Sequence, residues 1–236
     1  MQPSNDSIEN SNHNRHWLSA ISLRLRAHWL LKGVGTTAYM SVFFIVYFHI
    51  MKNPAADITI MPLTFVDQLI SFQPAALIPY VTLWIYVSLA PALILDRREL
   101  VGYGIWIAAL CIAGLLCFYL WPTTVILPTD EWRKHASFSI LQGVDAAANA
   151  CPSMHVAAAL FTACWLDHIL RDIGAPSFAR AMNWLWLIAI SYSTMAIKQH
   201  VFIDVIAGLA LGLIFVLPSL KYRWHGGSAA LDPPYG

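Results

Sequence analysis

Long apolar runs separated by short polar segments dominate the chain. Each run has about the 20 residues that an α-helix needs to cross roughly 30 Å of hydrocarbon. The runs are continuous rather than alternating, which favours helices over strands. The pattern therefore predicts six membrane-spanning helices, near residues 33–51, 76–95, 101–121, 153–170, 182–198 and 201–219.

The segments that flank these runs complete the predicted domain organisation. Residues 1–14 are polar, and residues 15–32 mix Trp, Leu, Arg and His as in an amphipathic helix on a membrane surface. We expect a polar segment and interfacial helix over 1–32, a six-helix membrane catalytic domain over 33–224, and a loose tail over 225–236. The first run starts too late and is too long for a cleaved signal peptide, so we expect it to be a retained anchor.

The composition agrees with a membrane setting. Hydrophobic residues make up 58% of the chain and charged residues 11%, whereas a soluble domain has about 45–50% and about 25%. The expected fold class is all-α, a polytopic membrane protein whose partner is the lipid bilayer. The net charge of +1 offers no basic surface for nucleic acid. The four cysteines show no zinc-ligand spacing, and the oligomeric state stays open.

The Lys and Arg residues predict an orientation. Ten of them fall on one side of the membrane if the runs span it in turn, namely Arg15, Arg24, Arg26, Lys32, Arg97, Arg98, Arg171, Arg180, Lys221 and Arg223. Four fall on the other side, namely Lys52, Arg133, Lys134 and Lys198. Because cytoplasmic loops are enriched in cations, both termini should be cytoplasmic in the plasma membrane. Loops 52–75, 122–152 and 198–200 should then face outward.

The sixth run opens with an ionisable pair, His200 and Asp204. Residues four apart on a helix share a face, roughly 6 Å apart, and an ionisable residue within a membrane span is costly unless it has a partner. A carboxylate bonded to one ring nitrogen fixes the imidazole tautomer and leaves the other nitrogen free to act as a nucleophile or base. The alternative is an interfacial histidine beside an aspartate that only caps the helix.

A second histidine, His155, lies one turn into the fourth run, at the same side of the membrane. Two imidazoles at one site permit one to attack and the other to protonate a leaving group. Lys198, Arg133 and Lys134 lie in the neighbouring outer loops, and cations beside two histidines favour an anionic substrate such as a phosphate. Ser153 and the first-turn N–H groups would add neutral donors.

Two other nucleophiles fit the sequence less well. A cysteine phosphatase has Arg after five further residues, but Ala157 occupies the corresponding place after Cys151. A serine hydrolase has Gly on both sides of its serine, whereas Pro152 and Met154 flank Ser153. We therefore expect Cys151 to be a packing residue and an imidazole to carry the chemistry.

The stretches PSMH at 152–155 and STMAIKQHVFID at 193–204 together resemble the type-2 phosphatidic-acid phosphatase superfamily. These are six-helix membrane lipid phosphatases and phosphotransferases with the pattern Pro-Ser-Gly-His, then Ser-Arg-x5-His-x3-Asp, preceded by Lys-x6-Arg-Pro. The resemblance covers roughly 70–236. Residues 70–93 and 145–157 are also similar to the branch that includes inositol phosphorylceramide synthases.

The resemblance implies a role for each matching position. His200 would take the phosphoryl group as a phosphohistidine, and Asp204 would orient it. His155 would protonate the departing alkoxide and then activate water or an alcohol, and Ser153 would bind phosphate oxygens. Such enzymes need no metal or other cofactor, and their partner would be a membrane lipid phosphate.

The chain departs from the family pattern at three places. Met154 stands at the Gly position, Thr194 stands at the Arg position, and Lys-x6-Arg-Pro is missing from 120–150. A phosphoryl transition state spreads charge over three oxygens and needs cationic donors. Lys198, Arg133 and Lys134 are therefore expected to replace the family cations.

Three functions are compatible with these features. The first is removal of phosphate from a lipid phosphate or pyrophosphate through His200. The second is transfer of a head-group phosphate to an alcohol, as in phosphorylceramide synthesis. The third is a non-catalytic membrane protein on the same helical scaffold. The sequence does not name the lipid, because Leu, Ile and Trp would line a tail-binding groove for many lipids.

Overall fold

The structure, a computed structural model of the chain, describes residues 17–126, 132, 136–138 and 149–223. Two predicted phosphate ligands, Arg133 and Lys134, lie outside these residues. The same holds for the polar segment over 1–14 and for the tail over 225–236. The domain boundaries proposed from the sequence therefore stay predictions.

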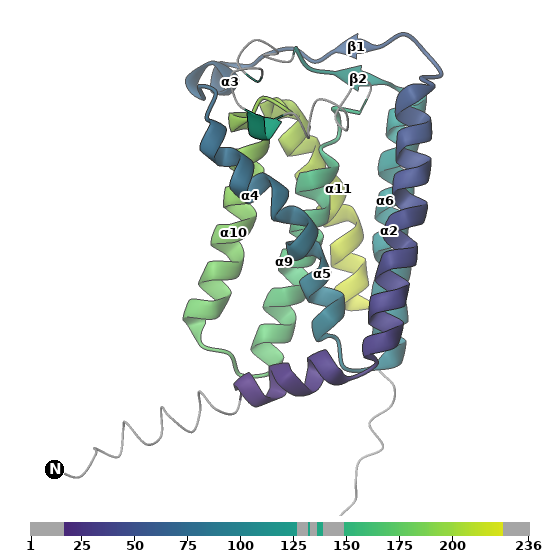
Figure 1. Cartoon of the computed structure of the whole chain (residues 1–236), viewed down its shortest axis with the longest axis vertical. Coiled ribbons are helices and arrows are strands. Elements are labelled where there is room, and N and C mark those ends of the chain that lie inside the picture. Colours follow the sequence, from purple (N-terminus) through teal and green to yellow (C-terminus); the bar gives the residue numbers. More distant parts are fainter. Residues whose placement is uncertain (1–16, 127–131, 133–135, 139–148, 224–236) are drawn as a thin grey trace, which may run out of the picture.

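Six long helical segments run side by side within the described part of the chain (Figure 1). They are α2 (Trp29–Lys52), η1 (Pro74–Ala76) with α4 (Leu77–Val81) and α5 (Leu83–Leu93), α6 (Arg97–Leu120), α9 (Met154–Asp172), α10 (Ser177–Ala196) and α11 (Phe202–Lys221). Each overlaps one of the six apolar runs, with ends that differ by a few residues. The second segment is interrupted between α4 and α5 at Thr82, whose hydroxyl bonds to the Pro79 carbonyl.

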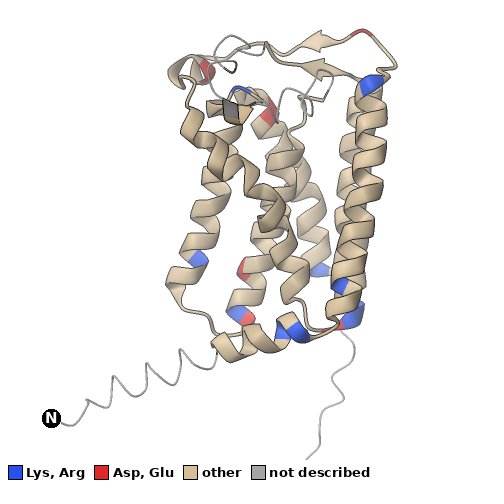
Figure 2. Cartoon of the chain, viewed as in Figure 1, with Lys and Arg blue, Asp and Glu red and all other residues tan. Residues whose placement is uncertain are grey.

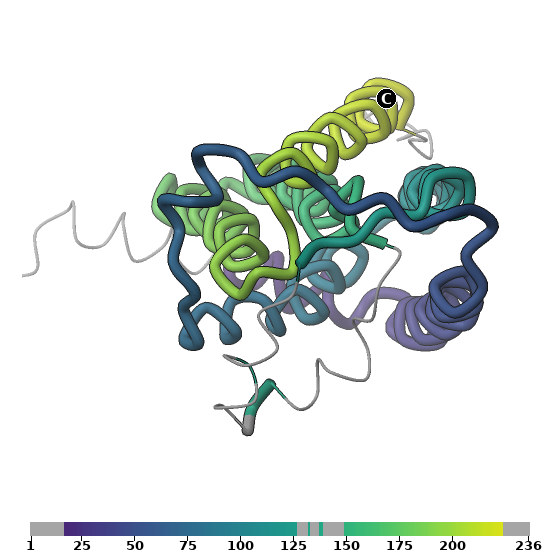
Figure 3. The backbone as a smooth tube through the Cα atoms, turned by 90° about the horizontal axis from the view of Figure 1, so that it is seen from above, coloured from purple at the N-terminus to yellow at the C-terminus, as the bar shows by residue number. Residues whose placement is uncertain are grey.

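Shorter elements close the upper end of the bundle in Figure 1. They are α3 (Phe65–Leu69), η2 (Ala136–Phe138) and the parallel two-residue strands β1 (Thr59–Ile60) and β2 (Thr123–Thr124). Viewed from above, the chain between α2 and α4 crosses the top of the bundle (Figure 3). These elements lie where the sequence predicts outer loops.

Four of the helical segments are long and apolar enough to cross a membrane, namely Trp29–Lys52, Pro74–Leu93, Arg97–Leu120 and Phe202–Lys221. This confirms the expected all-α membrane protein, while the count of six spans stays a prediction. Helix α9 is not one of these four segments. It packs against α5, α6, α10 and α11, which separate it from the surroundings of the bundle. A helix enclosed by its neighbours needs little apolar surface toward lipid.

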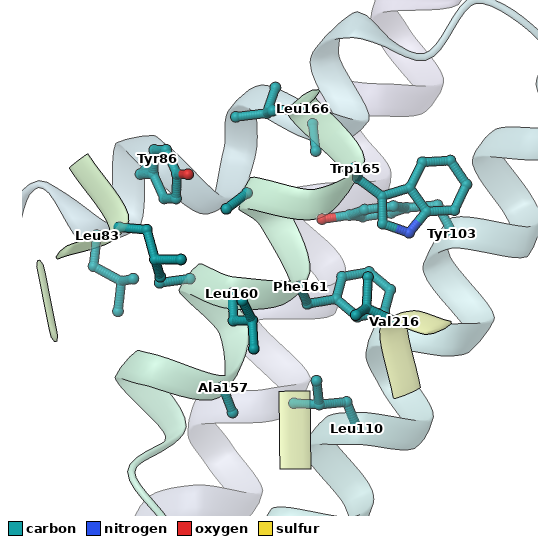
Figure 4. Close-up of a cluster of buried hydrophobic side chains, with 14 of the residues drawn as sticks. Leu83, Tyr86, Tyr103, Leu110, Ala157, Leu160, Phe161, Trp165, Leu166 and Val216 are labelled. Atoms are coloured by element: carbon teal, nitrogen blue, oxygen red, sulfur yellow. The ribbon is translucent and has the colours of Figure 1, made fainter. Parts of the chain in front are cut away.

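Large aromatic side chains fill the space around α9 (Figure 4). Phe161 and Trp165 project from α9 against Tyr103 of α6, with ring centroids 5.4 and 5.3 Å away. The Trp165 indole donates to the Ser219 hydroxyl of α11 at 2.9 Å, so its polar atom is satisfied in the core. This cluster fixes α6, α9 and α11 as one packed unit.

Two glycines of α11 permit its close approach to α9. A Cβ at Gly208 would lie 2.5 Å from the Ser153 carbonyl oxygen, and one at Gly212 would lie 2.9 Å from the Ala157 carbonyl oxygen. Real Cβ atoms do not come so near, so only glycine fits both places. The contact sets the distance between the two helix starts that carry the histidine motifs.

The N-terminal helix over 17–26 lies across the lower end of the bundle (Figure 1). Arg24 pairs with Asp172 at 3.2 Å and donates to the Leu93 carbonyl. Lys32 of α2 donates to the carbonyls of Arg24 and Ala92 at 2.6 and 2.7 Å. These bonds tie the helix to three others, and its predicted place on a membrane surface is compatible with them.

Most of the described Lys and Arg residues lie at this lower end (Figure 2). Asp167, an ionisable residue of the fourth apolar run, is neutralised there by Arg171 at 2.7 Å and Arg180 at 2.9 Å. The distribution matches the end that the sequence assigns to the cytoplasm. The orientation itself stays a prediction.

Candidate active site

The starts of α9 and α11 meet at the upper end of the bundle and bring the two sequence motifs together. The Ser153 N–H donates to the Asp204 carbonyl at 3.0 Å. The Ser153 hydroxyl caps α9 by accepting from the Val156 N–H at 3.4 Å, and Ser153 is fully buried. Its hydroxyl therefore has a structural bond already, and its phosphate-binding role stays a prediction.

Both predicted catalytic imidazoles line one cavity of ≈ 990 Å³. The ring centroids of His155 and His200 are 5.7 Å apart. His155 also contacts two aromatic rings. It stacks on Tyr80 of α4 with ring centroids 4.5 Å apart, and it makes an edge contact with Trp84 of α5 with centroids 5.9 Å apart. The two imidazole rings are thus close enough for both to contact one phosphate group.

Asp204 lies directly behind His200. The distance from His200 Nδ1 to Asp204 Oδ2 is 3.5 Å, which is ion-pair range and slightly long for a hydrogen bond. The same Oδ2 accepts from the Val201 N–H at 2.9 Å, so Asp204 also caps α11. Asp204 is fully buried, and its Oδ1 has no hydrogen-bond partner among the described residues. The helix cap is present as a hydrogen bond, whereas His200 Nδ1 lies near Asp204 without a hydrogen-bond partner among the described residues, so the orienting role of Asp204 stays a prediction.

The turn that carries His200 is fixed by backbone bonds at the end of α10. The N–H groups of Gln199 and His200 both donate to the Thr194 carbonyl, at 3.0 and 3.1 Å. Lys198 adopts a left-handed conformation with φ 64°, which is costly for a residue other than glycine. Thr194, at the family's Arg position, is fully buried, and its hydroxyl donates to the Ser191 carbonyl.

Helix α3 of the outer loop holds the same turn from the other side. Asp67 Oδ1 accepts from the Phe202 N–H at 2.7 Å, the first residue of α11. The Lys198 ammonium donates to the carbonyls of Asp67 and Ile70, at the carboxyl end of α3. The geometry engages Lys198 as a tie between α3 and the His200 turn. Its role as a phosphate ligand stays a prediction.

Gln199 is a site residue that the sequence reasoning missed. It lines the cavity beside His200, its side chain is 7% exposed, and its Nε2 has no hydrogen-bond partner among the described residues. A buried amide donor without a partner costs free energy unless a ligand satisfies it. The sequence signal was its place next to the candidate nucleophile, in a turn that also contains a lysine.

Tyr80 and Trp84 were missed as well. They lie four residues apart in the second apolar run, so a helical face brings both to one place. Both rings contact His155, whereas the sequence indicates only that the two residues belong to a membrane span. An aromatic pair at this spacing is common in spans, so the sequence alone gave no reason to connect it with His155.

Met154, at the family's Gly position, is accommodated by a glycine elsewhere. Its thioether lies over Gly114 of α6, where a Cβ would collide with the sulfur. The larger side chain therefore fills space between α9 and α6 without displacing His155. This departure from the family pattern is compensated within the core.

Cys151 is held in a setting that opposes nucleophilic chemistry. Its N–H donates to the Thr123 hydroxyl at 2.7 Å, and the residue is buried. Burial, together with the nearby Asp204 carboxylate, raises the pKa of the Cys151 thiol to about 12. A thiol that stays protonated is a poor nucleophile, which favours the prediction that Cys151 is a packing residue.

A helical membrane bundle with two imidazoles in one cavity, and a buried carboxylate behind one of them, is the arrangement expected of a membrane enzyme. A family model, PAP2 superfamily, matches residues 34–227, and the chain belongs to this superfamily. Membership indicates a membrane protein with phosphatase or phosphotransferase activity on lipid phosphates. No curated protein and no solved structure matches the chain. Similarity to the inositol phosphorylceramide synthase branch stays a prediction.

Proposed function

We propose that the protein is a lipid phosphate phosphatase that works through a phosphohistidine on His200. The observation that carries this proposal is the pair of imidazoles, 5.7 Å apart in one cavity, with Asp204 behind one of them. The superfamily membership supports the broader activity. Beyond this broader activity, we propose His200 as the nucleophile and water as the acceptor of the phosphoryl group.

In the first step the Nε2 lone pair of His200 attacks phosphorus, and the bond from phosphorus to the lipid oxygen breaks. Because Nδ1 is turned toward Asp204, the carboxylate keeps the proton on Nδ1 and stabilises the positive charge that develops on the ring. His155, as an imidazolium, gives its proton to the departing lipid alkoxide. The products are a lipid alcohol and phospho-His200.

In the second step water attacks the phosphohistidine. His155, now neutral, takes a proton from the water as its oxygen bonds to phosphorus. The bond from phosphorus to His200 breaks, and inorganic phosphate leaves. Both steps use only side chains of this chain, so we expect no cofactor or metal to be needed.

The phosphate oxygens require donors, and Gln199 supplies one. Its buried Nε2 has no other partner among the described residues and lies next to the nucleophile in the chain. Arg133 and Lys134 remain proposed as the cations. Lys198 is proposed to act in addition by holding the turn, since its ammonium binds the end of α3.

We also propose that the site faces outward from the plasma membrane. The starts of α9 and α11, which carry the two histidine motifs, lie at the upper end of the bundle (Figure 1). This is opposite to the end where the Lys and Arg residues cluster (Figure 2), and cation-rich ends are cytoplasmic. A substrate would then enter from the outer leaflet with its phosphate at the height of the lipid headgroups.

The test is phosphate release by the purified protein in detergent, on a panel of lipid phosphates and pyrophosphates with a metal chelator present. His200→Ala prepared in parallel controls for contaminating phosphatases. Release by the wild-type protein alone supports the proposal. A product that forms only when inositol or another alcohol is added would show transfer instead of hydrolysis. No turnover of any phosphate donor, with or without an alcohol, would support the non-catalytic alternative.

A further inference from the structure

The cavity that contains the histidines continues as an apolar groove along α2, α5 and α6. Its upper end is marked by Tyr47, whose hydroxyl is bonded by the Asn149 amide and which lines the same cavity as His155 and His200. Its lower end is marked by Lys32, which binds the carbonyl end of α5. One continuous space therefore joins the proposed catalytic site to the opposite end of the bundle.

The groove is deeper than one leaflet of a membrane. On α2 its lining runs from Leu31 to Phe48, a rise of about 26 Å at 1.5 Å per residue. On α6 it runs from Leu100 to Phe118, which gives about 27 Å by the same rise. Half of the hydrocarbon core is only about 15 Å thick. An occupant that filled the groove from the histidines downward would pass the middle of the membrane.

Two glycines leave the lower part of this groove open. Gly35 of α2 and Gly104 of α6 both line it, and a Cβ built at either would meet nothing within 4 Å. They lie about 20 Å below Phe48 and Phe118 along their helices. A side chain at either place would reduce the depth of the groove to little more than one leaflet.

We propose that this groove holds the hydrocarbon tail of the substrate, and that the substrate is a lipid phosphate with a tail longer than one leaflet. This rests on the proposed function, because the phosphate must contact both His155 and His200. The lining is almost wholly apolar and is continuous with that site. Gly35 and Gly104 are the specificity-determining residues, since they keep the lower part free for the end of the tail.

Selection for length arises from shape rather than from hydrophobicity. A tail in the bilayer is already surrounded by hydrocarbon, so moving it into the groove gains little by transfer alone. A short tail leaves the lower groove to unrelated lipid, whereas a long tail makes contacts along its whole wall. A side chain that blocks the lower groove forces a long tail into strain or out of the groove, which costs about tenfold or more in affinity.

The test compares two substrates of the same head group, one with a tail shorter than a leaflet and one long enough to reach Lys32. The variants are Gly104→Leu and Gly35→Leu, and the matched control is Gly33→Leu. Gly33 also has no atom near its Cβ, but it does not line the groove. The measured quantity is the ratio of kcat/KM for the long substrate to kcat/KM for the short one.

We expect this ratio to exceed unity in the wild-type protein, to fall about tenfold in Gly104→Leu and Gly35→Leu, and to stay unchanged in Gly33→Leu. A ratio that is equal in all four proteins, with good turnover, would overturn the proposal and leave the groove to ordinary membrane lipid. Photolabelling with a long alkyl phosphonate that carries a reactive group at its far end tests the tail-binding groove separately from the phosphatase activity. Labelling near Gly35 without any phosphate release would retain the groove and overturn the phosphatase. Labelling confined to the region of Phe48 would overturn the groove.

Discussion

Glycines on two sides of the bundle have opposite surroundings. On the side of α9 and α11, Gly208 and Gly212 lie so near neighbouring carbonyls that no side chain fits. On the side of α2, Gly33 and Gly35 face open space, and only Lys32 and Met51 of that 24-residue helix are buried. The first side is packed like a protein interior, and the second leaves room for something that is not protein.

This difference assigns different tasks to the two sides. Catalysis needs reacting groups held within a fraction of an ångström, which tight packing provides. Tail binding needs a space whose walls tolerate a flexible chain, which the groove along α2 provides. His155 and His200 lie where the two sides meet, since α9 belongs to the packed side and both rings line the groove.

Apart from loss of the nucleophile itself, the largest effect is expected from Asp204→Asn, which weakens the packed side at its catalytic carboxylate. An amide does not hold the Nδ1 proton of His200 or its developing charge, so kcat should fall by about 10²–10⁴-fold, as for the loss of an orienting carboxylate in a triad. Asp172→Asn is the matched control, because its partner Arg24 is at the other end of the bundle. Steady-state kinetics with equal yields of folded protein decide; a loss below about threefold would remove Asp204 from the mechanism.

Gly208→Leu tests the packing contrast directly. The new side chain has no place beside the Ser153 carbonyl, so the free energy of unfolding should fall by about 3 kcal/mol or more. The control Gly33→Leu enters open space and removes a helical glycine, so it should be neutral or stabilise by up to about 1 kcal/mol. Thermal unfolding in detergent measures both. Equal stability of the two variants would show that the sides do not differ as described.

Gln199→Leu removes the buried amide that we propose as a phosphate donor while keeping a similar volume. Loss of a hydrogen bond to a charged group should lower kcat/KM by about 10- to 100-fold, with unchanged or improved stability, because the amide has no protein partner among the described residues. Gln73→Leu provides the same chemical change at an exposed residue. If Gln199→Leu and Gln73→Leu behave alike, Gln199 is not a donor.

The smallest effect on catalysis is expected from Lys198→Met. The ammonium binds the end of α3, so its loss should lower the free energy of unfolding by about 1–2 kcal/mol and kcat/KM by less than about tenfold. A phosphate ligand would give the opposite result, with intact stability and a fall in kcat/KM of about 10- to 100-fold. Measuring both quantities on one preparation distinguishes the two roles.

Much of the fold could be predicted because the bilayer imposes a simple pattern. Continuous apolar runs of about 20 residues predict helices regardless of their neighbours, and all six runs are helical in the structure. The spacing of His200 and Asp204 likewise predicted that they lie close together, although His200 is in the turn before α11 and only Asp204 is within the helix. The sequence did not show which helix would be central, since the burial of α9 depends on which helices surround it.

The surroundings of the catalytic candidates could not be predicted for the same reason. Tyr80 reaches the site only through a tertiary contact between segments far apart in the chain. The tie between Lys198 and the carbonyls of α3 joins residues 128 and 131 positions apart, and nothing in either segment indicates the other. A cation near a candidate nucleophile predicts a substrate ligand, and the sequence does not show that its ammonium also binds the main chain of another segment.

The central claim is that His200 receives the phosphoryl group, and the most direct test is to find that group on the protein. The wild-type enzyme would be mixed briefly with a lipid phosphate, denatured at alkaline pH to preserve a phosphohistidine, and digested for peptide mass spectrometry. We expect a phosphoryl group on His200 that is absent from His200→Ala, and this variant should also lack turnover. A phosphoryl group on another residue, or full turnover by folded His200→Ala, would contradict the central claim.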